Sequence, residues 1–213
     1  MWEFVSERWQ DIAYRAFQHT SLVVQALVLA TVIAIAVALL VTRVKALEPV
    51  ANAISAIGLT IPSFALLGLL LPLVGIGTLP SVLLVTFYAT LPILRNAVVG
   101  LMGVSPLLME SAQGMGMSAF GRFLRVQLPL AWPVIMAGLR TSAQMSMGVA
   151  AIAAYALGPG LGQYIFTGLT QIGGQNAVPY AVVGTVGIII LALLLDAILL
   201  LVSRLTTSKG IRA

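Results

Sequence analysis

The sequence predicts an all-α integral membrane protein with five transmembrane helices and a cytoplasmic loop of short helices. Three observations predict this fold. Of the 213 residues, 60% are apolar and only 8% are charged, the mean hydropathy is +1.08, and the apolar residues form five long runs. A soluble domain has roughly 45–50% apolar and about 25% charged residues. The composition therefore excludes a soluble globular protein.

Each apolar run is bounded by charged residues, Pro or Gly and is about as long as a membrane-spanning helix requires. No internal repeat or linker separates the runs, so we treat residues 21–205 as one membrane domain with a tail at 206–213. The expected spans lie near residues 21–42, 53–74, 79–102, 133–156 and 178–202.

The basic residues predict the orientation of these spans. The loops at 75–78 and 157–177 carry no charge, whereas the other ends of the spans are basic. Because cytoplasmic loops carry an excess of Lys and Arg, we expect the N-terminus outside, the C-terminus inside and loop 103–132 in the cytoplasm. This bias also accounts for the net charge of +5 without nucleic acid. The basic residues on the expected cytoplasmic side are Arg43, Lys45, Arg95, Arg122, Arg125, Arg204, Lys209 and Arg212.

Residues 1–20 contain apolar side chains at intervals of three and four, which places both of their tryptophans on one helix face. This pattern predicts an amphipathic helix at the outer membrane surface. A polar lead-in to the first span is the alternative. The apolar positions are Trp2, Val5, Trp9, Ile12 and Ala16.

The residue types also exclude several kinds of site. The chain has no Cys and one His, His19, so it lacks the ligands for a thiolate or multi-His metal site and has no thiol nucleophile. Its two lysines, Lys45 and Lys209, do not belong to a nucleotide-binding P-loop. We therefore expect no metal, no bound nucleotide and no catalytic residue in this chain.

The fourth expected span is unusually polar. Arg140 at mid-membrane costs about 2.5–3.5 kcal/mol, whereas one Leu, Ile or Val returns only about 0.3–0.6 kcal/mol. This helix should therefore lie inside a bundle. A stripe of small residues, spaced by four, predicts close packing against another helix. The stripe consists of Gly138, Ser142, Ser146, Ala150 and Ala154.

Polar residues and helix-breaking prolines within the spans mark candidates for a solute pathway, because prolines free backbone groups that need partners or water. Packing alone is the alternative. Asp196 lies in the fifth span, and we expect it to pair with Arg95 or Arg140 rather than to relay protons, since no chain of acids accompanies it. The pathway candidates are Pro62, Ser63, Asn96, Arg140, Thr141, Gln144 and Met145.

The loop between the third and fourth spans is apolar and rich in Met. Gly114 and Gly116 allow it to bend, and Ser118 is suited to cap a second short helix. Apolar and Met side chains at a cytosolic surface are typical of a partner-binding surface. Folding of the loop back beneath the bundle or onto the membrane is an equal alternative.

The same loop resembles the EAA motif of ABC importer permeases. The motif begins with Glu110-Ser111-Ala112, and Gly116 follows after three intervening residues. Nine residues separate Gly116 from Val126, and one more residue separates Val126 from Leu128-Pro129. Ser111 and Val126 replace the usual Ala and Ile. The segments 61–80, 91–101, 110–118 and 128–140 resemble permeases of the osmoprotectant branch. LGPGLG at 157–162 departs from that branch through Pro159.

The resemblance implies a type I, binding-protein-dependent importer that works by alternating access in the bacterial inner membrane. Its partners would be an ATPase that binds ATP and Mg, a second permease subunit, identical or homologous, and an extracytoplasmic binding protein. The loop would form coupling helices that dock on the ATPase. The residues implied in coupling are Glu110, Ser111, Ala112, Gly114, Met115, Gly116, Met117, Leu128 and Pro129.

The resemblance also implies an osmoprotectant as solute, such as glycine betaine, choline or carnitine. Aromatic residues are scattered along the sequence, so we expect an aromatic cage for the quaternary ammonium in the binding protein instead. A permease for another small solute, such as an amino acid, is the alternative. A carrier or channel without ATP is less favoured, because the spans contain too few acids. The scattered aromatic residues are Phe64, Phe87, Tyr88, Tyr155, Tyr164 and Phe166.

Overall fold

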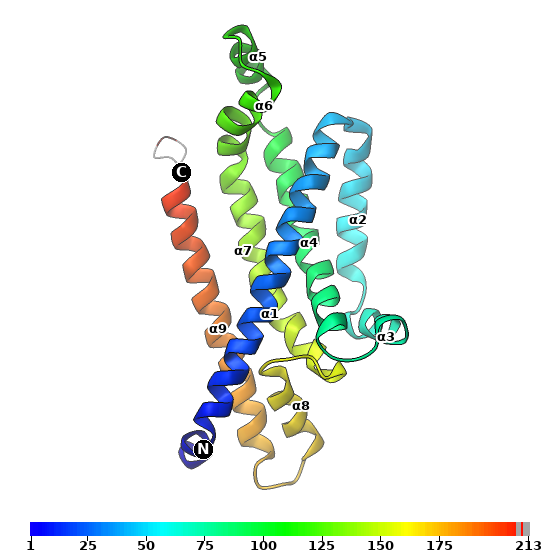
Figure 1. The fold of residues 1–213 in the computed structure, drawn as a ribbon, viewed down its shortest axis with the longest axis vertical. Helices are drawn as coiled ribbons and strands as arrows, with labels where there is room; N and C mark the ends of the chain where they lie inside the picture. The colour runs from blue at the N-terminus through cyan, green and yellow to red at the C-terminus, as the bar shows by residue number, and fades with distance from the viewer. Residues whose placement is uncertain (208–209, 211–213) are drawn as a thin grey trace.

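The computed structural model describes residues 1–207 and 210, and these residues form an elongated helical bundle (Figure 1). The expected tail at 206–213, with Lys209 and Arg212, lies largely outside the described residues. The long helices are α1 (Trp2–Arg43), α4 (Thr78–Met102), α7 (Leu128–Ala153) and α9 (Ala177–Thr206). The shorter ones are η1 (Lys45–Leu47), α2 (Glu48–Thr60), α3 (Ser63–Val74), α5 (Pro106–Gly114), α6 (Ala119–Arg122), η2 (Phe123–Gln127), η3 (Ala154–Ala156) and α8 (Gly162–Thr170).

The core of the bundle lies where α4 packs between α1 and α7. On α1, alanines at every fourth position are completely buried, and they allow the neighbouring backbones to approach closely. In contrast, α9 is mostly exposed on the outside of the bundle. The buried alanines are Ala26, Ala30, Ala34 and Ala38.

By length and composition, α1, α4 and α9 can each cross a membrane, and α2 and α3 add a fourth crossing if the pair counts as one span. Although α7 is 26 residues long, it does not meet the same criterion among the described residues. Polar side chains in its middle lower its hydropathy. Five spans therefore stay a prediction that depends on α7 being sheltered by its neighbours.

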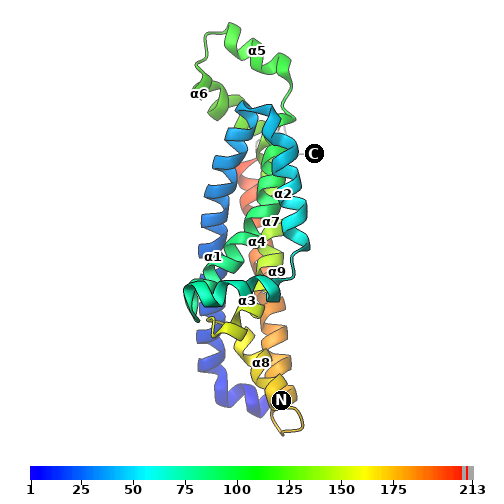
Figure 2. The same cartoon turned by 90° about the vertical axis from the view of Figure 1, so that its right-hand side faces the viewer.

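The expected single helix over 53–74 is wrong. Its apolar run is divided between α2 and α3, which meet at an angle of 95°, and α3 lies across the bundle (Figure 2). Proline causes the break, because Pro62 has no N–H to donate and its ring forces the preceding residue out of the helical region. Ile61 accordingly has an extended backbone, with φ −65° and ψ 125°.

The N-terminus and the end of α9 lie at opposite ends of the bundle (Figure 1). The N-terminus is remote from α5 and α6, whereas α9 ends on their side (Figure 1). Residues 1–20 are the first turns of α1 rather than a separate element. Both Trp2 and Trp9 are exposed, while Phe4 is buried and contacts Tyr180. Which end faces the cytoplasm stays a prediction.

The second short helix of the loop is continuous with α7. It begins at α6 and runs through a π-helical turn, η2, so α7 starts at Leu128 instead of near residue 133. Pro129 contributes to the irregular turn, because it has no N–H to donate to the Arg125 carbonyl, the bond that would continue an α-helix there. The end of the loop and α7 thus form one continuous helical segment.

Candidate functional site

The loop of α5 and α6 projects beyond one end of the bundle (Figure 2). Its apolar side chains are not folded back, since Leu107 is 73% exposed, Met115 71% and Phe120 70%. By contrast, Ala112 is buried inside the loop. An exposed apolar surface of this kind is typical of a site that binds another protein or the membrane surface.

The turn between α5 and α6 depends on Gly116. Its φ of +81° lies in the left-handed region, where other residues are strained. The turn is closed by a hydrogen bond of 3.1 Å from the Met117 N–H to the Ala112 carbonyl. Ser118 caps α6 by accepting a hydrogen bond from the Gly121 N–H at 3.2 Å, which confirms the predicted cap.

The remaining motif residues surround this turn. Glu110, Ser111 and Gly114 are exposed on α5, and Leu128 and Pro129 begin α7. Next to them, residues 115–118, 120–121 and 124–125 line an open concavity of about 540 Å³. The loop thus presents one acidic group, a turn and an open hollow with both polar and apolar lining on a single projecting element.

Two faces of α7 have different roles. The small-residue stripe is buried, and α7 packs more extensively against α4 than against any other helix. At Gly138, a methyl group would come 2.6 Å from the Asn96 Cβ, and the Ser142 hydroxyl donates to the Ala89 carbonyl. The opposite face carries exposed residues at helical spacing, namely Ala137, Thr141, Gln144, Gly148 and, just beyond the helix, Tyr155.

This exposed face is not suited to lipid contact. It contains polar and small side chains, whereas a helix facing lipid is covered with large apolar ones. Thr141 and Gln144, both predicted for the pathway, lie on it, and Met145 beside them is half-buried. The face is therefore a candidate wall of a water-filled path or of a contact with another subunit.

Arg140 is engaged in an ion pair. Its Nε and Nη2 donate hydrogen bonds of 2.9 Å each to the two carboxylate oxygens of Asp196. This bidentate contact joins α7 to α9 and confirms the expected pairing of Asp196, with Arg140 rather than Arg95 as its partner. The side chain of Arg140 is thus held by Asp196, and a contact of Arg140 with the solute stays a prediction.

The other pathway candidates are dispersed. Pro62 and Ser63 lie at the break before α3, where the Tyr88 hydroxyl donates to the Ile61 carbonyl. Asn96 is half-buried between α4 and α7, and its amide donates to the Pro92 carbonyl at 2.9 Å. Asn96 thus lies against Gly138 on the buried stripe of α7 rather than on its exposed face.

Three aromatic rings that are far apart in the sequence meet in the structure. Phe64 from α3, Tyr155 from η3 and Phe166 from α8 lie with their ring centroids 5.5, 6.3 and 5.6 Å apart. Sequence periodicity could not reveal this cluster, because each ring comes from a different element. None of its three residues is among the predicted pathway or coupling residues.

A polar network connects α1 to α8 at the same end of the bundle. The Tyr164 hydroxyl donates to Asp11 at 2.7 Å, and Arg15 pairs with Asp11 at 2.8 Å and donates to Gln163. Burial, with a further contribution from the Asp11 carboxylate, raises the pKa of Tyr164 well above its ordinary value. This network holds α8 in place beside α1.

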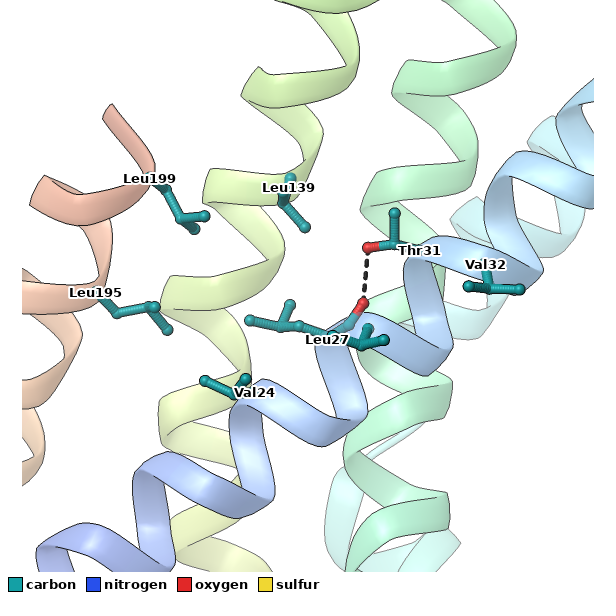
Figure 3. Close-up of a pocket in the computed structure, with 8 residues that line it drawn as sticks. Val24, Leu27, Thr31, Val32, Leu139, Leu195 and Leu199 are labelled. Atoms are coloured by element: carbon teal, nitrogen blue, oxygen red, sulfur yellow. Dashed lines mark hydrogen bonds between the residues drawn. The ribbon is translucent and has the colours of Figure 1, made fainter. Parts of the chain in front are cut away.

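An apolar groove of about 350 Å³ runs between α1, α7 and α9 (Figure 3). Leu139, Leu195 and Leu199 line one side. The hydroxyl of Thr31, on α1, already donates to the Leu27 carbonyl at 2.6 Å. The groove consequently offers nothing to a polar solute.

Within residues 1–207 and 210, no group of three acidic, His or Cys side chains could hold a metal.

Comparison with known proteins decides the family. Residues 26–208 match the family described as "Binding-protein-dependent transport system inner membrane component". The chain belongs to this family. It is therefore a multi-pass inner-membrane subunit of a transport system, and its projecting loop and polar α7 face belong to a permease.

Curated relatives match nearly the whole chain. The glycine betaine/carnitine/choline transport system permease protein OpuCB of Bacillus subtilis (strain 168) is 35% identical, covering 100% of this chain and 96% of the relative. The osmoprotectant import permease protein OsmW of Salmonella typhimurium is 39% identical, covering 94% of each chain. These relatives place the permease in the osmoprotectant branch of the ABC importers.

A solved structure has the same fold. A chain of the MetNI methionine ABC transporter in an inward-facing conformation matches with a TM-score of 0.78. It is 24% identical, and the match covers 92% of this chain and 96% of the other. This likeness concerns the fold.

Proposed function

We propose that this permease imports a quaternary ammonium osmoprotectant, such as glycine betaine, choline or carnitine, in a transporter driven by a separate ATPase. The similarity of almost the entire chain to osmoprotectant permeases, at 35–39% identity, carries the proposal. The ATPase would bind ATP and Mg, and an extracytoplasmic binding protein would deliver the solute. A second permease subunit would complete the path.

The projecting loop is the proposed contact with the ATPase. Exposed Leu107, Met115 and Phe120 would fill an apolar cleft of that partner, and Glu110 would supply a polar contact beside them. Since α6 continues through η2 into α7, a movement of the docked loop would tilt α7 as a lever. ATP-driven closure of the ATPase would thereby alternate access to the solute path.

The exposed face of α7 is the proposed wall of that path. Thr141, Gln144 and Gly148 offer small and hydrogen-bonding groups without charge, which suits a zwitterionic or cationic solute that must leave again. One chain with few long helices cannot enclose such a face. Pairing with a second permease would shelter α7 from lipid and explain why a helix of its polarity is tolerated.

Uptake by the reconstituted transporter tests the substrate. Vesicles containing the permease, its ATPase and its binding protein should accumulate radiolabelled choline, glycine betaine or carnitine only with ATP present. Methionine serves as the competing solute of another class. ATP-dependent uptake of methionine without any uptake of the quaternary ammonium compounds would contradict the proposal.

A further inference from the structure

We propose that Phe64, Tyr155 and Phe166 form a cation–π site in the permease itself, which receives the trimethylammonium group of the solute. This inference rests on the proposed function for its solute class. The three residues are called the aromatic triad below. The sequence had placed the expected cage in the binding protein, and the structure adds a second candidate in this chain.

The geometry of the aromatic triad differs from that of core packing. Its three rings contact one another mutually, with interplanar angles of 75°, 84° and 59°. Phe64 is nevertheless 49% exposed and Tyr155 63% exposed. Rings that served only to fill the core would be buried, whereas Phe64 and Tyr155 leave aromatic surface accessible, and the face of an aromatic ring carries the negative quadrupole that attracts a cation.

The surroundings of the aromatic triad carry no charge that would compete with such a ligand. The segments 49–94 and 141–195, which contain all three rings, have no Asp, Glu, Lys, Arg or His. The charged side chains that contact α8, Asp11 and Arg15, pair with each other. A cation entering here would meet neither a repelling ammonium nor a carboxylate that traps it.

This chemistry fits the group that the solutes of the relatives share. Glycine betaine, carnitine and choline all bear a trimethylammonium group, which has no N–H and cannot donate an ordinary hydrogen bond. Aromatic faces are the usual protein partner of such a group. A charge-free aromatic site would bind this common end and tolerate the different carboxylate and hydroxyl ends.

The location is suitable for a point of entry. Phe64 lies directly after the 95° break between α2 and α3, and Tyr155 ends the exposed face of α7 that carries Gln144 and Gly148. Both α3 and α8 lie away from the end with α5 and α6 (Figure 1). In the expected orientation, a solute released outside meets the aromatic triad before the polar face of α7.

The first test is equilibrium binding of radiolabelled tetramethylammonium to the permease–ATPase complex in nanodiscs without binding protein. Replacing Phe64 or Tyr155 by Leu keeps an apolar side chain and removes the ring, so binding should weaken about three- to thirtyfold. Tyr155→Phe keeps the ring and should bind like the native complex. Phe17→Leu, at an exposed aromatic position on α1 outside the triad, is the matched control.

A neutral competitor separates charge from shape. Choline should displace the bound tetramethylammonium, and 3,3-dimethylbutanol, in which carbon replaces the charged nitrogen, should not. Equal displacement by both compounds would overturn the proposal, since simple apolar packing would then explain binding. A second result would also overturn the proposal: tetramethylammonium shows no saturable binding, and Phe64→Leu separates the two permease subunits. The aromatic triad would then be a contact between subunits.

Uptake by the complete transporter distinguishes the two proposals. Phe64→Leu and Tyr155→Leu should lower choline uptake at saturating binding protein and leave the ATPase stimulation by that protein unchanged, since the proposal assigns the rings to the solute and not to the binding protein. Native uptake of choline with unaltered rates in both variants would refute the triad and leave the proposed function intact. Failure of the native transporter to take up any quaternary ammonium compound would instead refute the proposed function.

Discussion

Replacing Gly116 by Ala should weaken binding of the ATPase to the loop without unfolding the permease. A Cβ at this position meets no atom within 4 Å, so sterics do not oppose the change. The backbone conformation opposes the change, because a φ of +81° is left-handed and costs a residue with a side chain about 1–2 kcal/mol. The free loop relieves this strain by leaving the turn, and docking must restore it.

The expected loss of affinity is thus about five- to thirtyfold, the equivalent of that strain. Gly114→Ala is the matched control, since a Cβ there also meets no atom within 4 Å and its φ is not positive. At the end of α5 this control should be neutral or slightly stabilising. Titration of the purified ATPase onto immobilised permease in nanodiscs measures both affinities.

Equal affinities of Gly116→Ala and Gly114→Ala would refute the reasoning. So would a loss of affinity in Gly114→Ala alone. Either result would mean that the left-handed turn does not determine the docked shape of the loop. The melting temperature of the Gly116 variant should stay close to that of the native permease, because the bundle does not pack on this turn. A lower melting temperature without a loss of ATPase affinity would not match the expectation.

The ion pair between α7 and α9 predicts that Arg140→Leu destabilises the permease by about 1–3 kcal/mol, less than a fully buried pair because its side chains are 33% and 20% exposed. The double change with Asp196→Leu should recover most of that loss in thermal melts, and no recovery would refute the pairing. Gly138→Ala should cost about 1–3 kcal/mol, since its methyl would lie 2.6 Å from a Cβ on α4, while Gly148→Ala, with open space, should cost little. The raised pKa of Tyr164 means that its hydroxyl contributes stability below pH about 10 and loses it at higher pH. The difference in melting temperature between native protein and Tyr164→Phe should stay constant from pH 6 to 9, and a decline within this range would contradict the assignment.

Local patterns in the sequence predict much of this fold. Long apolar runs indicate α1, α4 and α9, because a membrane helix needs about 20 apolar residues wherever it lies. The spacing of small residues predicts the packed face of α7 for the same local reason. Ser118 and its helix cap follow from a side chain and a backbone only three residues apart.

Features that depend on backbone detail or on distant contacts are harder to predict. The apolar run at 53–74 conceals the bend before α3, although Ile61 preceding Pro62 was the available signal. Likewise, Pro129 signals the π-helical turn only once the helix is known to continue through it. The aromatic triad arises from three separate elements, and no periodicity within one segment encodes such a meeting.

Co-purification of the tagged permease in mild detergent tests the central claim, that the projecting loop couples this subunit to an ATPase. The account predicts that a P-loop ATPase, identified by mass, is present in stoichiometric amount with the native chain. It should be lost from a Glu110→Lys, Gly116→Asp variant that still reaches the membrane, and retained by Glu3→Lys at the other end of the bundle. A native chain that purifies without any ATPase and still moves solute in vesicles would contradict the account.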